Sequence, residues 1–285
     1  MAAESDDRLL IGPGAQAGDD QSRMNQSTRG QWDWYASHRR AIERLIVPEA
    51  RGGRICVLGA GNCNDLDLKW LAGAYAEVHL VDIDPAALER AVQRQGVADV
   101  AGIWRHAPVD LTGIAGMTAA WQGRSVRDDE VGRAVEAVGR PVQPIEGGGF
   151  DVVLSPCVLS QLLVAVRDRV GKEHRGWPRL KRAITERHLA EWTGAVRGGG
   201  RGVMIVDLTS TRVVPGLDRA GDADVPDLMR MCVRDRKCFH GLEPAELAGV
   251  LRRISVGGAE VSAPWIWHLG FGKAFLCYGM TVRTG

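Results

Sequence analysis

The stretch ICVLGAGNCNDLDL, residues 55–68, runs from apolar residues into two glycines, Gly59 and Gly61, and then into small polar residues. A short, continuous apolar run is typical of a parallel strand that is buried on both faces. Glycines directly after such a strand allow a tight turn and let a ligand approach the backbone. The stretch therefore predicts a strand, a ligand-binding loop and a following helix.

Strand and helix patterns alternate along the rest of the chain, which predicts a doubly wound, three-layer α/β/α domain. The last two strands are separated only by a glycine-containing turn, so they should pair antiparallel, because a parallel pair needs a crossover. Asp84 and Pro85 form a strong helix start. The predicted segments are a helix in 31–47, a strand at 55–58, a helix in 65–75, strands in 77–84 and 103–111, a strand and helix in 150–163, a helix, glycine stop and strand in 180–208, a short helix in 210–242, a helix in 243–254 and two strands in 258–283.

The two ends of this pattern set the domain limits. Residues 1–28 have almost no periodic apolar content and are expected to form a mobile N-terminal tail. A single domain is expected over residues 29–285, with an N-terminal helix and an insertion near 112–149 that contains a helix.

Composition narrows the classes of partner. Formal net charge is +1 over 285 residues, with no basic stripe, so a small molecule is favoured over nucleic acid. No run reaches the ~18 apolar residues of a membrane span, and no signal peptide is recognised, so a cytoplasmic protein is expected. Six cysteines without paired spacing are ordinary for a reducing compartment, and abundant Gly, Ala, Arg and Val are typical of a bacterial source.

An acidic residue completes the predicted ligand site. Asp82 ends the second strand about twenty residues after the glycines, where a carboxylate can accept both hydroxyls of a ribose. This predicts a cofactor that contains a nucleoside, although a glycine turn without a ligand remains the alternative. A dinucleotide site would have a third glycine where Asn64 stands, which counts against NAD and FAD.

In their order and spacing these motifs resemble those of the class I (Rossmann-like) S-adenosylmethionine-dependent methyltransferases, over residues 30–283. The resemblance implies a seven-stranded, mostly parallel sheet of order 3-2-1-4-5-7-6 with an antiparallel last strand. Two departures are Val57, where the family often has an acid, and Cys63, in place of a third glycine; Asn64 and Asp65 are then further candidate anchors. The matching segments are VLGAGNCND (57–65), VHLVDIDPAALERA (78–91), APVDL (107–111), FDVVLSPCVLSQLL (150–163) and GGGRGVMIVDL (198–208).

The resemblance also implies roles for individual residues in binding S-adenosylmethionine. Asp82 would hold the ribose, Asp110 the adenine amino group, and Tyr35 would close over the cofactor. The implied cofactor contacts are Tyr35, Gly59, Ala60, Gly61, Asn64, Asp82, Ile83, Asp110, Leu111, Ser155 and Pro156.

The methyl acceptor is less well defined by the sequence. Enzymes of this fold that methylate base amines carry Asn/Asp-Pro-Pro-aromatic after the fourth strand, whereas residues 155–158 read SPCV, so a nucleic acid is disfavoured. His174 and His240 are candidate general bases, with a structural histidine as the alternative for each. Trp32, Cys157, Gln161 and Trp177 are candidate acceptor contacts, and Cys157 is either a nucleophile or a packed thiol. No metal site is expected, because Cys232, Cys238 and His240 lack paired spacing and a fourth ligand.

The sequence therefore favours a methyltransferase that converts S-adenosylmethionine to S-adenosylhomocysteine while it methylates a small molecule, in specialised biosynthesis. The alternatives are a nicotinamide-dependent oxidoreductase, a protein or RNA methyltransferase, and a non-catalytic cofactor-binding module. A homodimer is left open.

Overall fold

The computed structural model describes residues 25–49, 52–140, 145, 148–254 and 258–285. Residues 1–24, most of the expected tail, lie outside the described residues. Asn25 to Thr28 do not behave as a tail, because they form a helical turn in which Asn25 is 5% exposed. The domain therefore begins before residue 29.

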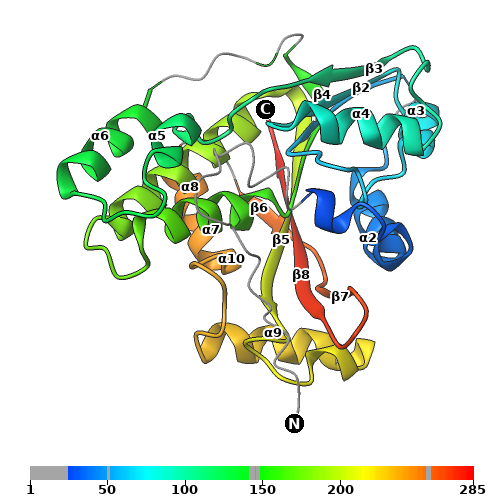
Figure 1. Ribbon diagram of the computed structural model, residues 1–285. Helices are drawn as coiled ribbons and strands as arrows, with labels where there is room; N and C mark the ends of the chain where they lie inside the picture. Colours follow the sequence, from blue (N-terminus) through cyan, green and yellow to red (C-terminus); the bar gives the residue numbers. More distant parts are fainter. Residues whose placement is uncertain (1–24, 50–51, 141–144, 146–147, 255–257) are drawn as a thin grey trace.

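One mixed sheet forms the centre of the molecule (Figure 1). Its order is β3-β2-β1-β4-β5-β8-β6, with β7 paired to β8. β8 is antiparallel to β5, and β1 to β5 are parallel. The strands are β1 (Arg54–Leu58), β2 (Glu77–Val81), β3 (Ile103–His106), β4 (Phe150–Pro156), β5 (Val196–Ser210), β6 (Ala259–Val261), β7 (Trp265–His268) and β8 (Ala274–Arg283).

The predicted order of the first five strands and the reversed strand next to β5 are confirmed. The expected terminal pair is instead three strands, because Pro264 interrupts the first of the two. Proline has no N–H to donate to a sheet, so β6 ends before it and β7 begins after it. The expected glycine stop is also different, since α8 ends at Gly194 and the glycines at 198–200 belong to β5.

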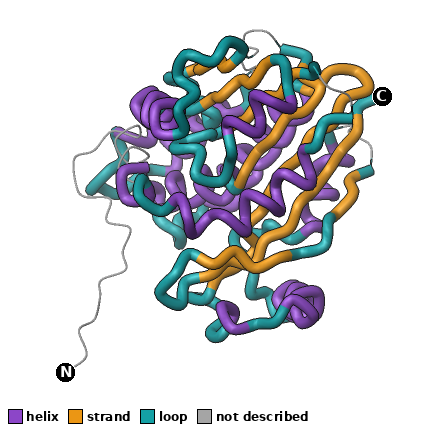
Figure 2. Tube along the Cα trace, turned by 90° about the vertical axis from the view of Figure 1, so that its right-hand side faces the viewer, coloured by secondary structure: helices purple, strands orange, loops and turns teal. Residues whose placement is uncertain are grey.

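Helices cover both faces of this sheet, and each face has its own apolar core (Figure 2). α2, α3 and α4 pack on one face, which we call the α2 face; α6, α7, α8 and α10 pack on the other, the α7 face. The expected insertion contains α5 and α6, and residues 141–144 and 146–147 within it are not described. The helices are η1 (Trp32–Tyr35), α2 (Ala36–Ile46), α3 (Leu68–Ala74), α4 (Pro85–Arg94), α5 (Ala115–Ala119), α6 (Asp128–Val138), α7 (Val158–Val170), α8 (Trp177–Gly194), η2 (Leu217–Arg219), η3 (Asp222–Asp224), α9 (Val225–Arg234) and α10 (Pro244–Arg253).

Two edges of the sheet matter for function. The carboxyl ends of β1, β2 and β4 form the carboxyl edge, and the order of connection reverses there between β1 and β4. Ligands of doubly wound sheets bind at such a switch point. The opposite edge, where β1, β4 and β5 begin, is the amino edge. In the described part of the chain, no helix is long and apolar enough to cross a membrane.

Candidate active site at the carboxyl edge

The two glycines after β1 are required for different reasons. Both have positive φ, +69° at Gly59 and +49° at Gly61, a conformation that side chains disfavour. A Cβ on Gly59 would overlap Val158 at the start of α7, so this glycine allows helix packing. A Cβ on Gly61 would lie 3.1 Å from Asn25 Oδ1 and 4.0 Å from Asp82 Oδ2, so only this glycine opens onto polar groups.

Asp82 closes the turn from the neighbouring strand. Its carboxylate accepts hydrogen bonds from the N–H of Gly61 and the N–H of Asp84, both at 2.8 Å. Burial raises the pKa of Asp82, which is 3% exposed, although the backbone hydrogen bonds oppose the shift. The acid predicted to meet the glycine loop therefore does so, while Asp84 caps α4 as predicted.

Residues 25–28, which we call the strap, lie across this turn. The Asn25 side-chain amide donates to Asp84 Oδ2 at 3.0 Å. Asn62 donates to the Asn25 carbonyl and to Thr28 Oγ1, and Asn64 Nδ2 donates to the Thr28 carbonyl at 2.8 Å. The strap is thus part of the site, and nothing in its local sequence predicts this.

Arg94 of α4 and Arg39 of α2 donate hydrogen bonds to the residues that follow Gly61 and so hold this loop in place. Arg94 donates to Asn64 Oδ1 at 2.6 Å and to the Asn62 carbonyl at 2.8 Å. Arg39 donates to the carbonyls of Trp32 and Asn64. Both guanidinium groups lie on the Trp32 ring, 3.6 Å away for Arg39 and 4.9 Å for Arg94. Trp32, expected to contact the acceptor, and Asn64, expected to contact the cofactor, therefore form part of this clamp.

Aromatic rings cover the loop from the α2 face. Tyr35 packs edge-on against Trp267 at 4.8 Å between ring centroids, and His38 stacks on Trp267 at 4.2 Å. Burial, with Asp65 and Cys157 nearby, raises the pKa of the Tyr35 hydroxyl. Tyr35 therefore lies beside Asp65 and Cys157, and its expected role in closing over the cofactor stays a prediction.

Three residues with predicted contacts to the cofactor or the acceptor lie at the end of β4: Ser155, Pro156 and Cys157. Ser155 is fully buried, and its hydroxyl lies 2.8 Å from His188 Nε2 of α8. Its side chain faces away from the glycine loop and cannot border the sulfonium. Pro156 ends β4, and Cys157 follows at the carboxyl edge with φ +51° as the N-cap of α7. A hydrogen bond with Cys277, burial and nearby Asp207 raise the pKa of the Cys157 thiol well above its usual value, so Cys157 is packed and is not an activated nucleophile.

Two carboxylates flank Cys157. Asp65 comes from the loop after β1, and Asp207 comes from β5, where Ser160 Oγ donates to its Oδ1 at 2.6 Å. Burial raises the pKa of each carboxyl to about 7. Asp65 is a candidate anchor from the sequence, whereas Asp207 lies in a quoted motif without an assigned role. The sequence signal that could have identified Asp207 is an acidic residue within an otherwise apolar strand.

The adenine contacts remain predictions. Ile83 is half-buried just after β2, and Leu111 is 9% exposed. The Asp110 carboxylate already accepts from Thr112 N–H, Thr112 Oγ1 and Ala115 N–H, so it organises the turn before α5. Ala60 is buried, and its N–H donates to the Val81 carbonyl.

The expected catalytic histidines lie elsewhere. His174 Nδ1 accepts from Gly176 N–H at 3.0 Å, and its Nε2 lies 3.1 Å from the Val126 carbonyl, so His174 joins the start of α8 to the insertion. His240 packs edge-on against Trp177, 6.4 Å between centroids, next to Arg167. Trp177 belongs to the core of the α7 face, whereas Tyr35, Ala60 and Cys157 belong to that of the α2 face. No described contact joins either histidine to the glycine loop, although the Phe239 N–H donates to the Leu208 carbonyl near the end of β5. The catalytic role of each histidine stays a prediction.

The remaining candidates add little to the site. Gln161 is half-buried in the first turns of α7, next to Ser160. Within the described ranges, no three His, Cys, Asp or Glu residues are grouped so that they could hold a metal ion.

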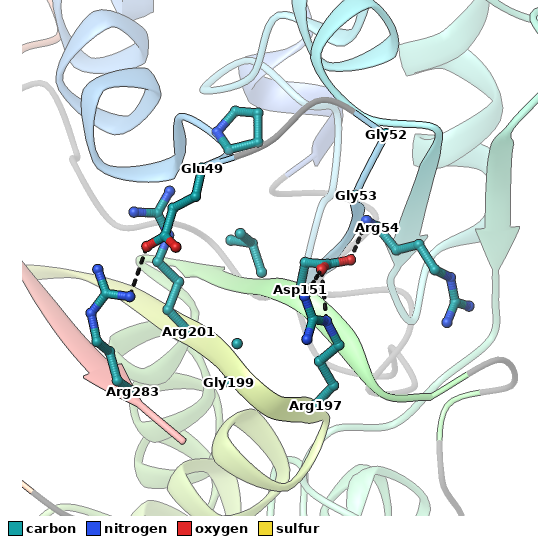
Figure 3. Close-up of a pocket in the computed structure, with 12 residues that line it drawn as sticks. Glu49, Gly52, Gly53, Arg54, Asp151, Arg197, Gly199, Arg201 and Arg283 are labelled. Atoms are coloured by element: carbon teal, nitrogen blue, oxygen red, sulfur yellow. Dashed lines mark hydrogen bonds and ion pairs between the residues drawn. The ribbon is translucent and has the colours of Figure 1, made fainter. Parts of the chain in front are cut away.

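A cavity of about 400 Å³ lies at the amino edge (Figure 3). Arg54, Arg197, Arg201 and Arg283 line it together with Asp151 and Glu49. Asp151 accepts from Arg197 and from the Arg54 N–H, and Glu49 accepts from Arg283 at 2.7 Å. Its charges are therefore largely paired with each other.

No protein-family model matches the chain, and neither does any curated protein. Solved structures align with the chain at low identity and with TM-scores below 0.5. They include N-methyltransferase NodS from Bradyrhizobium japonicum in complex with S-adenosyl-L-homocysteine (14% identity, 88% of this chain and 87% of that one, TM-score 0.44), the YcgJ protein from Bacillus subtilis (10%, 87% and 98%, 0.46) and an O-methyltransferase family protein from Burkholderia thailandensis (15%, 94% and 60%, 0.42).

These similarities carry no assignment by themselves. The strand order, with its reversed strand beside β5, is that of the Rossmann-like fold of class I S-adenosylmethionine-dependent methyltransferases. The chain has this fold, with one additional strand, β7, beside β8.

Proposed function

We propose that the chain is a methyltransferase that uses S-adenosylmethionine to methylate a small molecule in specialised metabolism. The observation that carries the proposal is the meeting of Gly61 and Asp82 at the switch point of the sheet, with a 2.8 Å hydrogen bond between them. A carboxylate beside a glycine turn suits a ribose, and the positive φ of Gly61 lets the backbone approach polar groups closely.

The surrounding residues fit this cofactor. Asp82 would hold the ribose hydroxyls, and Ile83 would lie against the adenine. The carboxylate of Asp65 makes no hydrogen bond to another side chain in the described ranges, and it lies near Tyr35 and Cys157. Asp65 would therefore hold the methionine ammonium group, a role that Val57 cannot perform.

Once bound, S-adenosylmethionine supplies a methyl group on a sulfonium, and the protein supplies position and electrostatics. Asp65 and Asp207 favour positive charge at this edge. The strap and η1 cover the loop, and such a covered site suits a small acceptor better than a nucleic acid or a protein. The net charge of +1 supports the same preference.

Calorimetric titration with S-adenosylhomocysteine, and separately with NADH, tests the proposal. We expect the first ligand to bind and to raise the melting temperature by about 5–10 °C at a hundred times its Kd, a stabilisation of about 2.7 kcal/mol. Asp82→Asn should weaken binding at least tenfold, whereas Asp99→Asn, at an exposed turn, should not. Binding of NADH alone, or no binding of S-adenosylhomocysteine, would overturn the proposal.

A further inference from the structure

Asp207 lies on β5 at the carboxyl edge of the sheet. The last register pair of β4 and β5 is Pro156 with Ile205, and the Cys157 N–H donates to the Ile205 carbonyl. Asp207 is two residues further along β5, just beyond the end of β4. It pairs with Cys277 of β8, whose side chain belongs to the core of the α2 face, and that places Asp207 on the face of Tyr35.

The two oxygens of Asp207 have different surroundings. Oδ1 accepts from Ser160 at 2.6 Å, so the carboxylate has a fixed orientation. Oδ2 makes no hydrogen bond to another side chain within the described part of the chain, and the carboxylate also accepts from its own backbone N–H. Burial raises the pKa of Asp207 to about 7, although the Ser160 hydroxyl opposes the shift. A carboxylate anchored by one oxygen and open at the other can bind a donor and accept its proton.

Aromatic side chains continue from Asp207 across the same face. Cys277 pairs with Trp265, and Phe275 pairs with Trp267 in the next row. Trp267 is 5.4 Å from Phe275 and 4.8 Å from Tyr35 between ring centroids. Rings of this kind attract cations through their faces.

The same aromatic group contains unsatisfied polar atoms. His38 Nδ1 accepts from Trp265 Nε1 at 3.1 Å, so in the neutral ring the proton is on Nε2. His38 Nε2 and Trp267 Nε1 are buried and have no hydrogen-bond partner among the residues described. Buried donors are rarely left unpaired in proteins, and a bound ligand or water explains such cases. These two unpaired atoms are an observation, separate from Asp207, that fits a polar ligand at the aromatic face.

We propose that Asp207 binds the amine of the methyl acceptor and takes a proton from it, so that the substrate is a small aromatic or apolar amine. This inference rests on the proposed function. The ammonium gives one proton to Asp207 Oδ2. The freed nitrogen lone pair then forms the bond to the methyl carbon while the carbon–sulfur pair stays on sulfur, and Asp207 later returns the proton to water.

The charge of the acceptor distinguishes an amine from a carboxylate or an alcohol at this site. A carboxylate acceptor would be repelled by both Asp65 and Asp207, and a neutral alcohol would gain a hydrogen bond but no ion pair. An ammonium gains the ion pair in a partly buried site and also the aromatic faces. Asp65 is left for the cofactor, so the two carboxylates hold two different cationic groups.

Fragment binding tests the inference without knowledge of the natural acceptor. Benzylamine, benzyl alcohol and benzoate are titrated by NMR into the protein saturated with S-adenosylhomocysteine. We expect benzylamine to bind best and benzoate not to bind. Asp207→Asn should weaken benzylamine at least tenfold and leave benzyl alcohol within about twofold. Asp227→Asn, the same change at an exposed position of α9, should leave both unchanged.

Each other result has one meaning. Equal binding of benzylamine to wild type and Asp207→Asn, preference for benzoate, or no binding of benzylamine would overturn the inference. Unchanged S-adenosylhomocysteine binding in Asp207→Asn shows that the variant is folded and that the proposed function stands. Failure of S-adenosylhomocysteine to bind the wild type would instead overturn the proposed function. If Asp207→Asn does not fold, Ser160→Ala, which frees Asp207 from its anchor, should also weaken benzylamine selectively.

Discussion

At the amino edge of the sheet, four arginines surround a cavity, and Arg54, Arg197 and Arg283 each face a carboxylate, while Arg201 donates to the Val47 carbonyl. At the carboxyl edge, Asp65 and Asp207 have no ion pair with a described residue, and the ring nitrogens His38 Nε2 and Trp267 Nε1 and the amide oxygen Asn62 Oδ1 are buried without a described partner. The amino edge has a cavity of about 400 Å³ (Figure 3). The carboxyl edge instead has buried polar atoms without hydrogen-bond partners among the described residues. The proposed function therefore rests on strained and unpaired groups and not on cavity volume or the number of charges.

The largest difference between the edges should appear in their glycines. Gly59→Ala is expected to lower the free energy of unfolding by about 3 kcal/mol, because the new methyl meets Val158, with Cγ1 at 3.1 Å, in a left-handed backbone. Gly52→Ala at the amino edge has a similar φ, +89°, but open space, and should cost only about 1 kcal/mol. Urea unfolding measures both. Equal costs would show that the carboxyl edge is no tighter than the amino edge.

Removal of one arginine from each edge should give the next largest contrast. Arg94→Ala breaks hydrogen bonds to Asn64 and Asn62 and exposes the Trp32 face, so we expect a loss of about 2 kcal/mol and weaker S-adenosylhomocysteine binding. Arg197→Ala removes an exposed ion pair with Asp151 and should cost less than about 1 kcal/mol. A cofactor affinity that falls equally in both variants would contradict the assignment of the site to the carboxyl edge.

The two edges should also respond to pH with opposite sign. Burial raises the pKa of Asp207 to about 7, so the folded state resists ionisation, and stability falls as pH rises from about 4 to about 7. Asp207→Asn removes this penalty and should stabilise the protein by about 1–2 kcal/mol at pH 8 but not at pH 4.

For Asp151, burial opposes ionisation, but hydrogen bonds from Arg54 N–H and Arg197 outweigh it and lower the pKa. Its contribution is present above the ordinary carboxyl pKa and is lost as pH falls. Asp151→Asn should therefore destabilise the protein at pH 8, by about 1 kcal/mol. Denaturant midpoints measured across this range would refute the comparison if both variants changed in the same direction.

The smallest effect is expected at the rim of the amino edge. Glu49 and Arg283 are exposed, and surface pairs of this kind contribute little. Glu49→Gln should change the melting temperature slightly at low salt and not at all at ~1 M salt. A large, salt-independent change would mean that the amino edge is more than a solvated surface.

The fold was accessible from the sequence because apolar runs and helix signals alternate clearly, and because Asp84 and Pro85 mark a helix start. The split into β6 and β7 depends on Pro264, a single residue within an otherwise continuous strand pattern. The glycines at 198–200 were misassigned as a helix stop, because glycine signals a turn locally while here it pairs with residue 284.

The site was accessible in part. Gly61 and Asp82 meet as predicted, since each follows from its place at the end of a strand. The role of Tyr35 stays a prediction. The catalytic roles of His174 and His240 stay predictions, because position after a strand does not reveal which neighbours a side chain meets. The shift in the pKa of Asp207 depends on burial beneath distant segments, so no local pattern contains it.

The strap has a practical consequence for anyone who prepares this protein. The sequence alone suggests that residues 1–28 could be removed, but the shortened chain would lack Asn25 and Thr28. Asn62 and Asn64 would lose partners, and Asp84 would lose the Asn25 amide. An inactive truncated preparation would then report damage to the loop after β1, and it could be mistaken for evidence that the protein has no catalytic role.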